Sequence, residues 1–279
     1  MEMTGKLIKY EMRSSIKLMA VIWAALIAAS LLFSLSIHVL GDMFFDDGEQ
    51  KLNVLVGIVE LVTGLMYAAV FAVLVVTTLV IVVMRFYRGL LGDEGYLMHT
   101  LPVKPWQLIT SKGVVAAGVV LVSMIVAFLS ILALAGANGF KVVPEMFRSV
   151  GAFLDKDPWY ILFFVEGVIL ILLSLLKSIY QIYASLAIGQ LANKHRVLLA
   201  LGAYIGLNLV ITILSAIVMV AAENLGISQW LNTVISGGAD NVFRAGQIGA
   251  GILFLLTAVQ LVGFHVITER ILSLKLNLQ

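Results

Sequence analysis

Cysteine is absent from this 279-residue chain, and charged side chains are scarce. Without cysteine there can be no disulfide, thiolate metal site, cysteine nucleophile or palmitoyl anchor. Only 12% of the residues are Asp, Glu, Lys or Arg, whereas a soluble globular domain carries about 25%. The net charge of +2 is too small to suggest a nucleic-acid partner. The composition therefore argues against a soluble globular domain and against a nucleic-acid-binding domain.

The common signatures of catalysis are missing as well. The chain has no GxxxxGK[ST] phosphate-binding loop, and so no standard ATPase core of its own. It also has no HExxH zinc motif and no GxSxG nucleophile elbow. The histidines are far apart in sequence and fall near predicted membrane edges, at His38, His99, His195 and His265. We interpret them as interfacial polar groups rather than metal ligands, and we expect no catalytic residue, cofactor or metal in this chain.

Long apolar runs dominate what is present. Hydrophobic residues make up 61% of the chain, and its mean hydropathy is +1.07. About 20 mainly apolar residues in a helix cross the roughly 30 Å core of a bilayer. Six stretches qualify, at residues 18–40, 54–84, 113–136, 159–190, 197–222 and 248–268. We expect the first to be retained rather than cleaved as a signal peptide. The pattern predicts an all-α, polytopic membrane protein with a single transmembrane domain over residues 1–279.

The positions of Lys and Arg orient these spans, because cytoplasmic loops carry an excess of positive charge. With a cytoplasmic N-terminus, the inner segments hold Lys6, Lys9, Arg13, Lys17, Arg85, Arg88, Lys104, Lys112, Lys194, Arg196, Arg270 and Lys275. The outer segments hold only Lys51, Lys141, Arg148, Lys156 and Arg244. We therefore predict that the N and C termini are both cytoplasmic.

Three segments outside the spans have recognisable patterns. Residues 5–17 gather their basic side chains on one side of a helix and their apolar ones on another. We favour an amphipathic interfacial helix there over a plain positive flank. Residues 223–247 surround a Gly-Gly break with mixed polar and apolar residues, which fits a short helix, a re-entrant hairpin or a plain loop equally well. Pro144 is expected to open a short helix between the third and fourth spans.

Ionisable side chains inside a span are candidate functional positions, because their uncompensated burial is costly. Glu60 lies in the second span, and Glu166 and Lys177 lie in the fourth. About three helical turns separate Glu166 from Lys177, so the two point within about 20° of each other. Polar residues that share this sector include Ser174, Ser178, Gln181 and Ser185. Two interpretations stay open here: structural pairing and snorkelling, or a translocation path or subunit interface. The candidates for the path or interface are Glu60, Glu166, Ser174, Lys177 and Gln181.

A single polar segment, GDEGYLMHTLPVKPWQLITSK, separates the second span from the third at Gly92–Lys112. Glycine makes its start flexible, and Pro102 and Pro105 end a short element, because the residue before a proline is pushed away from helical conformation. Trp106 then begins the helix of the third span at the interface. A stiff cytoplasmic element joined to two spans is suited to docking a protein and transmitting its movement.

The stretch RFYRGLLGDEGYLMHTLPVKPWQLITSK resembles the cytoplasmic loop of ABC-2 type transporter permeases, especially the small ones of Firmicutes. The KYEMR before the first span and the six-span layout are similar to that family too. The resemblance implies that residues 85–112 form a coupling loop, that residues 5–17 match a gate or elbow helix, and that residues 223–247 match a re-entrant element. The residues implied to dock on the ATPase are Gly92, Asp93, Glu94, Gly95, Tyr96, Leu97, His99, Thr100 and Leu101.

As such a permease, the chain is expected to serve an ABC exporter in the bacterial cytoplasmic membrane. It would move a hydrophobic or amphipathic substrate, such as a peptide, outward by alternating access. The implied partners are two copies of a soluble ABC ATPase carrying ATP and Mg, membrane lipid, and a second permease, with a homodimer favoured over a heterodimer. One alternative is a non-transporting scaffold or sensor that recruits a cytoplasmic protein. A weaker one is an intramembrane enzyme that uses the acids Glu60 and Glu166.

Overall fold

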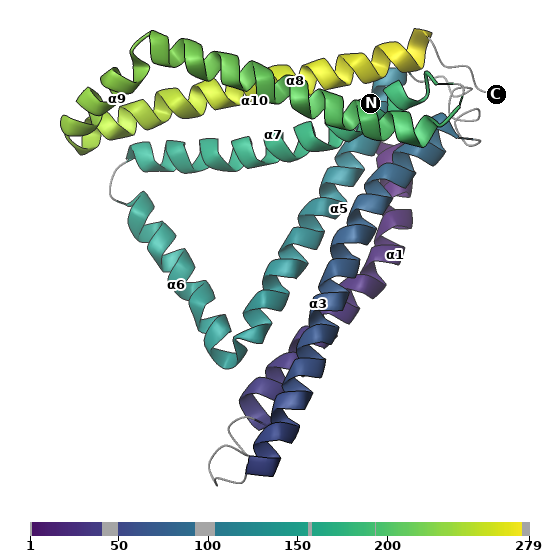
Figure 1. Cartoon of the computed structure of the whole chain (residues 1–279), viewed down its shortest axis with the longest axis vertical. Coiled ribbons are helices and arrows are strands. Elements are labelled where there is room, and N and C mark those ends of the chain that lie inside the picture. Colours follow the sequence, from purple (N-terminus) through teal and green to yellow (C-terminus); the bar gives the residue numbers. More distant parts are fainter. Residues whose placement is uncertain (1, 41–49, 93–103, 156–157, 193, 275–279) are drawn as a thin grey trace. The chain divides into compact units, whose positions relative to one another are not determined.

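The computed structural model describes residues 2–40, 50–92, 104–155, 158–192 and 194–274, and every regular element in these ranges is a helix (Figure 1). Six of the described helical stretches are long and apolar enough to cross a membrane: Ile8–His38, Val56–Leu91, Pro105–Leu134, Tyr160–Gly189, Arg196–Asn224 and Ala245–Ser273. The prediction of an all-α, multi-pass membrane protein is confirmed at this level.

The chain divides into two compact units. The first contains Met1–Val82 and Val114–Asp157, and the second contains Val83–Gly113 and Pro158–Gln279. Two helices, α3 (Gln50–Phe86) and α5 (Pro105–Leu134), each contribute to both units. The ends of α3 and α5 that flank residues 93–103 therefore belong with the second unit, and not with the rest of their own helices.

Apolar side chains of α1 (Glu2–Leu35), α3 and α5 form the core of the first unit. Its buried residues are Met19, Leu26, Leu74, Ile81 and Val119. Aromatic side chains extend this core, and the rings of Phe33 and Tyr67 stack with centroids 6.2 Å apart. Gly64 admits the Phe33 ring, because a Cβ built at Gly64 would lie only 3.1 Å from it.

Polar side chains in the first unit pair with one another across helices. The indole N–H of Trp23 donates to Ser123 Oγ at 3.1 Å, and the hydroxyl of Thr78 donates to the same oxygen at 3.3 Å. The hydroxyls of Tyr67 and Ser130 lie 3.1 Å apart. Ser36, in the π-helical turn η1 (Ser36–Leu40), lies 2.8 Å from the hydroxyl of Thr63. Such hydrogen bonds hold apolar helices together where water is absent.

Residues 5–17 lie within α1, which continues without a break from Glu2 to Leu35. Met12 in this segment lies close to α5, since a Cβ built at Gly118 would be 3.7 Å from the Met12 sulfur. Ser15 is buried and donates to the Glu11 carbonyl at 3.0 Å. The segment is therefore helical and joins the first span directly, and its placement in a membrane interface stays a prediction.

Pro144 lies inside α6 (Gly136–Leu154), so the prediction that it opens a helix is wrong. The helix begins instead at Gly136, whose φ of +60° makes the turn after α5. His38 fills the space beside that glycine, 3.2 Å from a Cβ built there. Pro144 is exposed, and a proline inside a helix removes one backbone hydrogen bond.

The second unit packs α7 (Pro158–Gly189) against both α8 (Arg196–Asn224) and α10 (Ala239–Leu274). Helices α7 and α10 run parallel, because Phe163 contacts Phe243 near their starts and Tyr180 contacts His265 further along both. The turn between α7 and α8 is tight. A Cβ at Gly189 would lie 2.6 Å from that of Ala200, and His195 takes a φ of 59° to begin α8.

Residues 223–247 contain a helix rather than a plain loop. Helix α9 (Ile227–Ser236) lies between Gly226, with φ +73°, and the pair Gly237–Gly238, where Gly238 has φ +106°. Both positive angles are conformations that glycine adopts without strain. Helix α9 packs against α8 and α10 (Figure 1), so the Gly-Gly break marks a helix boundary, and re-entry into a membrane remains a prediction.

Candidate functional site

The segment predicted to dock an ATPase lies almost wholly outside the described residues. Of its predicted docking residues only Gly92 is described, while Asp93, Glu94, Gly95, Tyr96, Leu97, His99, Thr100 and Leu101 are not. The two stems on which the segment is mounted are described, one at the end of α3 and one at the start of α5. The geometry of these stems shows how the segment is held.

The first stem consists of Phe86, the last residue of α3, and the π-helical turn η2 (Tyr87–Leu91), which follows α3 directly. The N–H of Gly92 closes it by donating to the Tyr87 carbonyl at 2.8 Å. Gly89, Leu90 and Leu91 are buried. A π turn is wider than an α turn and is frequent at functional sites.

The second stem begins with a capped helix start. Pro105 takes the first helical position, where a proline costs no hydrogen bond. The Lys104 N–H donates to Gln107 Oε1 at 3.1 Å, which is half of a capping box. Helix α5 therefore starts one residue before the predicted Trp106, and Leu108, Ile109, Ser111 and Lys112 are buried immediately after this cap.

A side chain of α7 contacts both stems. The ring of Tyr183 stacks on Phe86 with centroids 4.0 Å apart and an interplanar angle of 13°. The Tyr183 hydroxyl donates to the carbonyl of Lys112 at 3.2 Å. Tyr183 and Phe86 are each 0% exposed, and Lys112 is 5% exposed. We call this group the stem cluster, and it consists of Phe86, Gly89, Leu90, Ile109, Lys112, Gly113, Tyr180 and Tyr183.

The polar stripe predicted on the fourth span faces α10. Around the axis of α7, Glu166 and Lys177 lie between Phe163 and Tyr180, and both of these rings contact α10. Glu166, Ser174 and Lys177 are half-buried, and Gln181 is 4% exposed. We call the contact between these helices the α7–α10 seam. The structure thus brings four of the five predicted residues to one helix face that packs against a neighbour.

The seam contains buried side-chain polar atoms that have no hydrogen-bond partner in the described part of the chain. Glu166 Oε2, Gln181 Nε2 and Gln247 Nε2 are the buried side-chain atoms without a hydrogen-bond partner among the described residues. Glu166 and Gln247 each lie one turn beyond the Phe163–Phe243 contact, so they occupy the same level of two parallel helices. An unpaired buried polar group costs about 1–3 kcal/mol. The seam therefore differs from the first unit, where polar side chains pair across helices.

Glu60 does not belong to the seam. It lies half-buried on α3 in the first unit, where its carbonyl accepts a hydrogen bond from Thr63 Oγ1 at 3.2 Å. Glu166 and Lys177 lie about three turns apart along α7, which is too far for a direct ion pair. No group of three or more His, Asp or Glu side chains in the described ranges could hold a metal ion.

The sequence analysis missed Tyr183, Gln247 and His265 as parts of these sites. Gln247 stands just before the predicted start of the last span, so it was counted with a loop. Tyr183 and His265 lie at the ends of the fourth and sixth spans, where aromatic and polar residues are ordinary interface anchors. A signal that could have found Tyr183 is its place among small residues, since Ala184 and Ala187 beside it are also buried.

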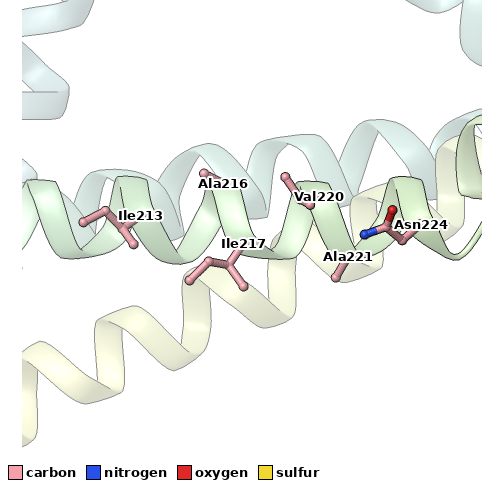
Figure 2. A pocket seen from close by; sticks show the side chains of 6 residues that line it. All are labelled: Ile213, Ala216, Ile217, Val220, Ala221 and Asn224. Carbon is pink, nitrogen blue, oxygen red and sulfur yellow. The ribbon is translucent and has the colours of Figure 1, made fainter.

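A hollow lies along one face of α8, lined by Ile213, Ala216, Ile217, Val220, Ala221 and Asn224 (Figure 2). Its lining is apolar apart from Asn224, and it contains none of the predicted path residues. A surface of this kind is what a lipid-facing helix presents. It supplies no polar group for chemistry beyond one amide.

Comparisons of the chain with protein-family models, with curated proteins and with solved structures find no match.

Proposed function

We propose that this chain is the membrane-spanning permease subunit of an ATP-driven exporter of the ABC-2 type. ATP would be hydrolysed by a soluble ATPase on another chain, because this sequence has no phosphate-binding loop. The proposed substrate is hydrophobic or amphipathic, such as a peptide, and the proposed membrane is the bacterial cytoplasmic membrane with both termini inside. Two ATPases and two permease copies would complete the exporter.

The observation that carries this proposal is how the polar segment Gly92–Lys112 is attached to the membrane helices. It lies between two helices that are long enough to span a membrane. Its stems are buried against Tyr183 of α7. A scaffold that merely recruits a protein has no need for such a connection. A transporter driven by a separate motor needs it, because the movement of the motor must reach the membrane helices.

The α7–α10 seam supports a role in transport. Three of its side-chain atoms are buried without a partner among the described residues, so an arrangement of α7 and α10 that gives these atoms partners would lower their free energy. Alternating access requires membrane helices with more than one arrangement. We propose that Glu166, Ser174, Lys177 and Gln181 contact the substrate path or the second permease in another state of the cycle.

The test is co-expression and reconstitution with a candidate soluble ATPase, beginning with one encoded by a neighbouring gene. We expect the ATPase to co-purify and to lose binding when Asp93, Glu94 and Tyr96 are replaced by alanine. Glu145→Ala, at an exposed position of α6, is the matched control and should keep the ATPase bound. ATP turnover is then measured against amphipathic peptides, drugs and lipids.

The same preparation tests the seam. Glu166→Gln and Lys177→Met should lower transport without releasing the ATPase, because both residues lie in α7 and neither is one of the predicted docking residues. Normal transport by both variants would make the polar stripe structural. An ATPase that binds but never drives transport of any tested compound would favour the scaffold or sensor and refute the permease.

A further inference from the structure

The stem cluster joins the polar segment to a third membrane helix that the sequence does not connect to it. The stems are continuous with α3 and α5, and α7 begins only at Pro158. Both stems nevertheless belong to the same compact unit as α7, α8 and α10. A displacement of the segment must therefore act on α7 through side chains, and the question is which ones.

Tyr183 provides this connection, because it contacts both stems at once. Its ring packs flat on Phe86 of the first stem, and its hydroxyl bonds the Lys112 carbonyl of the second. Both rings are fully buried in this contact, and burial of aromatic side chains is a large part of packing energy. A hydrogen bond between membrane helices contributes about 0.6 kcal/mol on average. Separating the stems from α7 would break both interactions together.

The surrounding packing leaves little room for the stems to slide. A Cβ at Gly113 would lie 2.8 Å from the Tyr180 hydroxyl, and one at Gly89 would collide with the Lys112 ammonium group. Leu90 and Ile109 are each 0% exposed beside these glycines. Groups packed this closely move as a body instead of deforming continuously.

The contacts continue from the stem cluster to α10. The rings of Tyr183 and Tyr180 have centroids 5.8 Å apart, and Tyr180 lies 5.3 Å from the ring of His265. Tyr180 is next to Gln181, one of the seam residues with an unpaired atom. A continuous series of side-chain contacts thus runs from the stems into the α7–α10 seam.

We propose that Tyr183 is a positioning residue that makes the two stems, at the end of α3 and the start of α5, move with α7 as one body, so that displacement of the stems by the motor acts directly on the α7–α10 seam. This inference rests on the proposed function for the source of the displacement. It adds a path for the movement of the ATPase, which would displace α7 as well as α3 and α5. The mechanical connection itself can be measured without any motor.

The absence of native cysteine lets spin labels be placed at chosen positions. Cysteines replace Lys104, exposed before α5, and Leu191, exposed after α7, in the full chain in lipid nanodiscs. Double electron–electron resonance reports the distance between the labels and the width of its distribution. Tyr183→Phe removes just the hydroxyl, and the Lys112 carbonyl is inside a helix, so folding should survive. Tyr67→Phe is the matched control, because it removes a similar interhelical hydroxyl contact to Ser130 in the first unit.

We expect a narrow distribution in the parent chain and in Tyr67→Phe, and a broadened or split one in Tyr183→Phe. Equal widths in all three overturn the inference, whether or not the chain is a permease. With the ATPase bound, Tyr183→Phe should keep hydrolysing ATP while transport per ATP falls about three-fold. Unchanged transport per ATP also overturns the inference. If the parent chain binds no ATPase, the proposed function is refuted. The distance distributions of the labels then still test whether Tyr183 holds the stems to α7.

Discussion

Gly113 shows how one missing Cβ sets the position of a ring. The Tyr180 side chain crosses α5 at this glycine and is 6% exposed, and Lys112 next to it offers its carbonyl to Tyr183. No pattern in the sequence distinguishes this glycine from Gly118, a few positions along the same helix, where a Cβ would make an ordinary contact 3.7 Å from Met12.

Gly113→Ala should therefore destabilise the protein. Its Cβ would lie 2.8 Å from Tyr180, and overpacking of this kind costs about 1–3 kcal/mol. The midpoint of thermal unfolding in detergent measures the effect. Gly118→Ala is the control and should leave the midpoint unchanged or raise it, because alanine favours helix over glycine. A Gly113→Ala midpoint equal to that of Gly118→Ala would contradict the packing described for Tyr180.

Gln247 is a second residue whose importance is visible only in the structure. Its Nε2 is buried and without a partner among the described residues, so Gln247→Leu removes a polar group that costs about 1–3 kcal/mol when unpaired. We expect an equal or higher unfolding midpoint for Gln247→Leu. Gln107→Leu serves as control and should lower the midpoint, because Gln107 Oε1 caps α5. A loss in Gln247→Leu as large as that in Gln107→Leu would show that the amide is paired in the folded protein.

At the scale of elements, hydropathy located the helices well, and their ends and breaks less well. The spans were found because each must be apolar along its whole length. Helix α1 joins the predicted helix of residues 5–17 to the first span without a break, because basic residues continue a helix as readily as apolar ones do. The prediction for Pro144 was wrong because it relied on the preference of proline for the first helical position, whereas this proline lies inside α6.

The pairing of α1 with α5 depends on a polar contact that can be measured as a coupling energy. Trp23 donates to Ser123 at 3.1 Å between buried apolar faces. In a double-mutant cycle with Trp23→Phe and Ser123→Ala, we expect a coupling of about 0.6 kcal/mol, the average for interhelical hydrogen bonds in membranes. Unfolding equilibria in mixed detergent give the four free energies. Strict additivity would mean that this contact does not join the helices.

At the scale of the whole molecule, the proposed orientation follows from the asymmetry of Lys and Arg. Two single-cysteine variants test it in this cysteine-free chain. A membrane-impermeant maleimide should label Glu145→Cys in intact cells and Lys104→Cys only after permeabilisation, and both positions are exposed. Labelling with the reverse pattern would place the Gly92–Lys112 segment outside and refute the proposed docking of a cytoplasmic ATPase.

The sequence by itself determined that the chain is a multi-pass helical membrane protein, because its spans are long and apolar enough to cross a bilayer. The bilayer core offers no water, so the backbone polar groups of each span must form their hydrogen bonds within a helix. It also placed Glu166, Ser174, Lys177 and Gln181 on one helix face, since a helical period fixes direction around an axis. Only the tertiary structure decided that this face meets α10 and that Tyr183 contacts both stems of the polar segment. The reason is that these contacts join residues far apart in sequence, and packing between helices depends on shapes that no local pattern records.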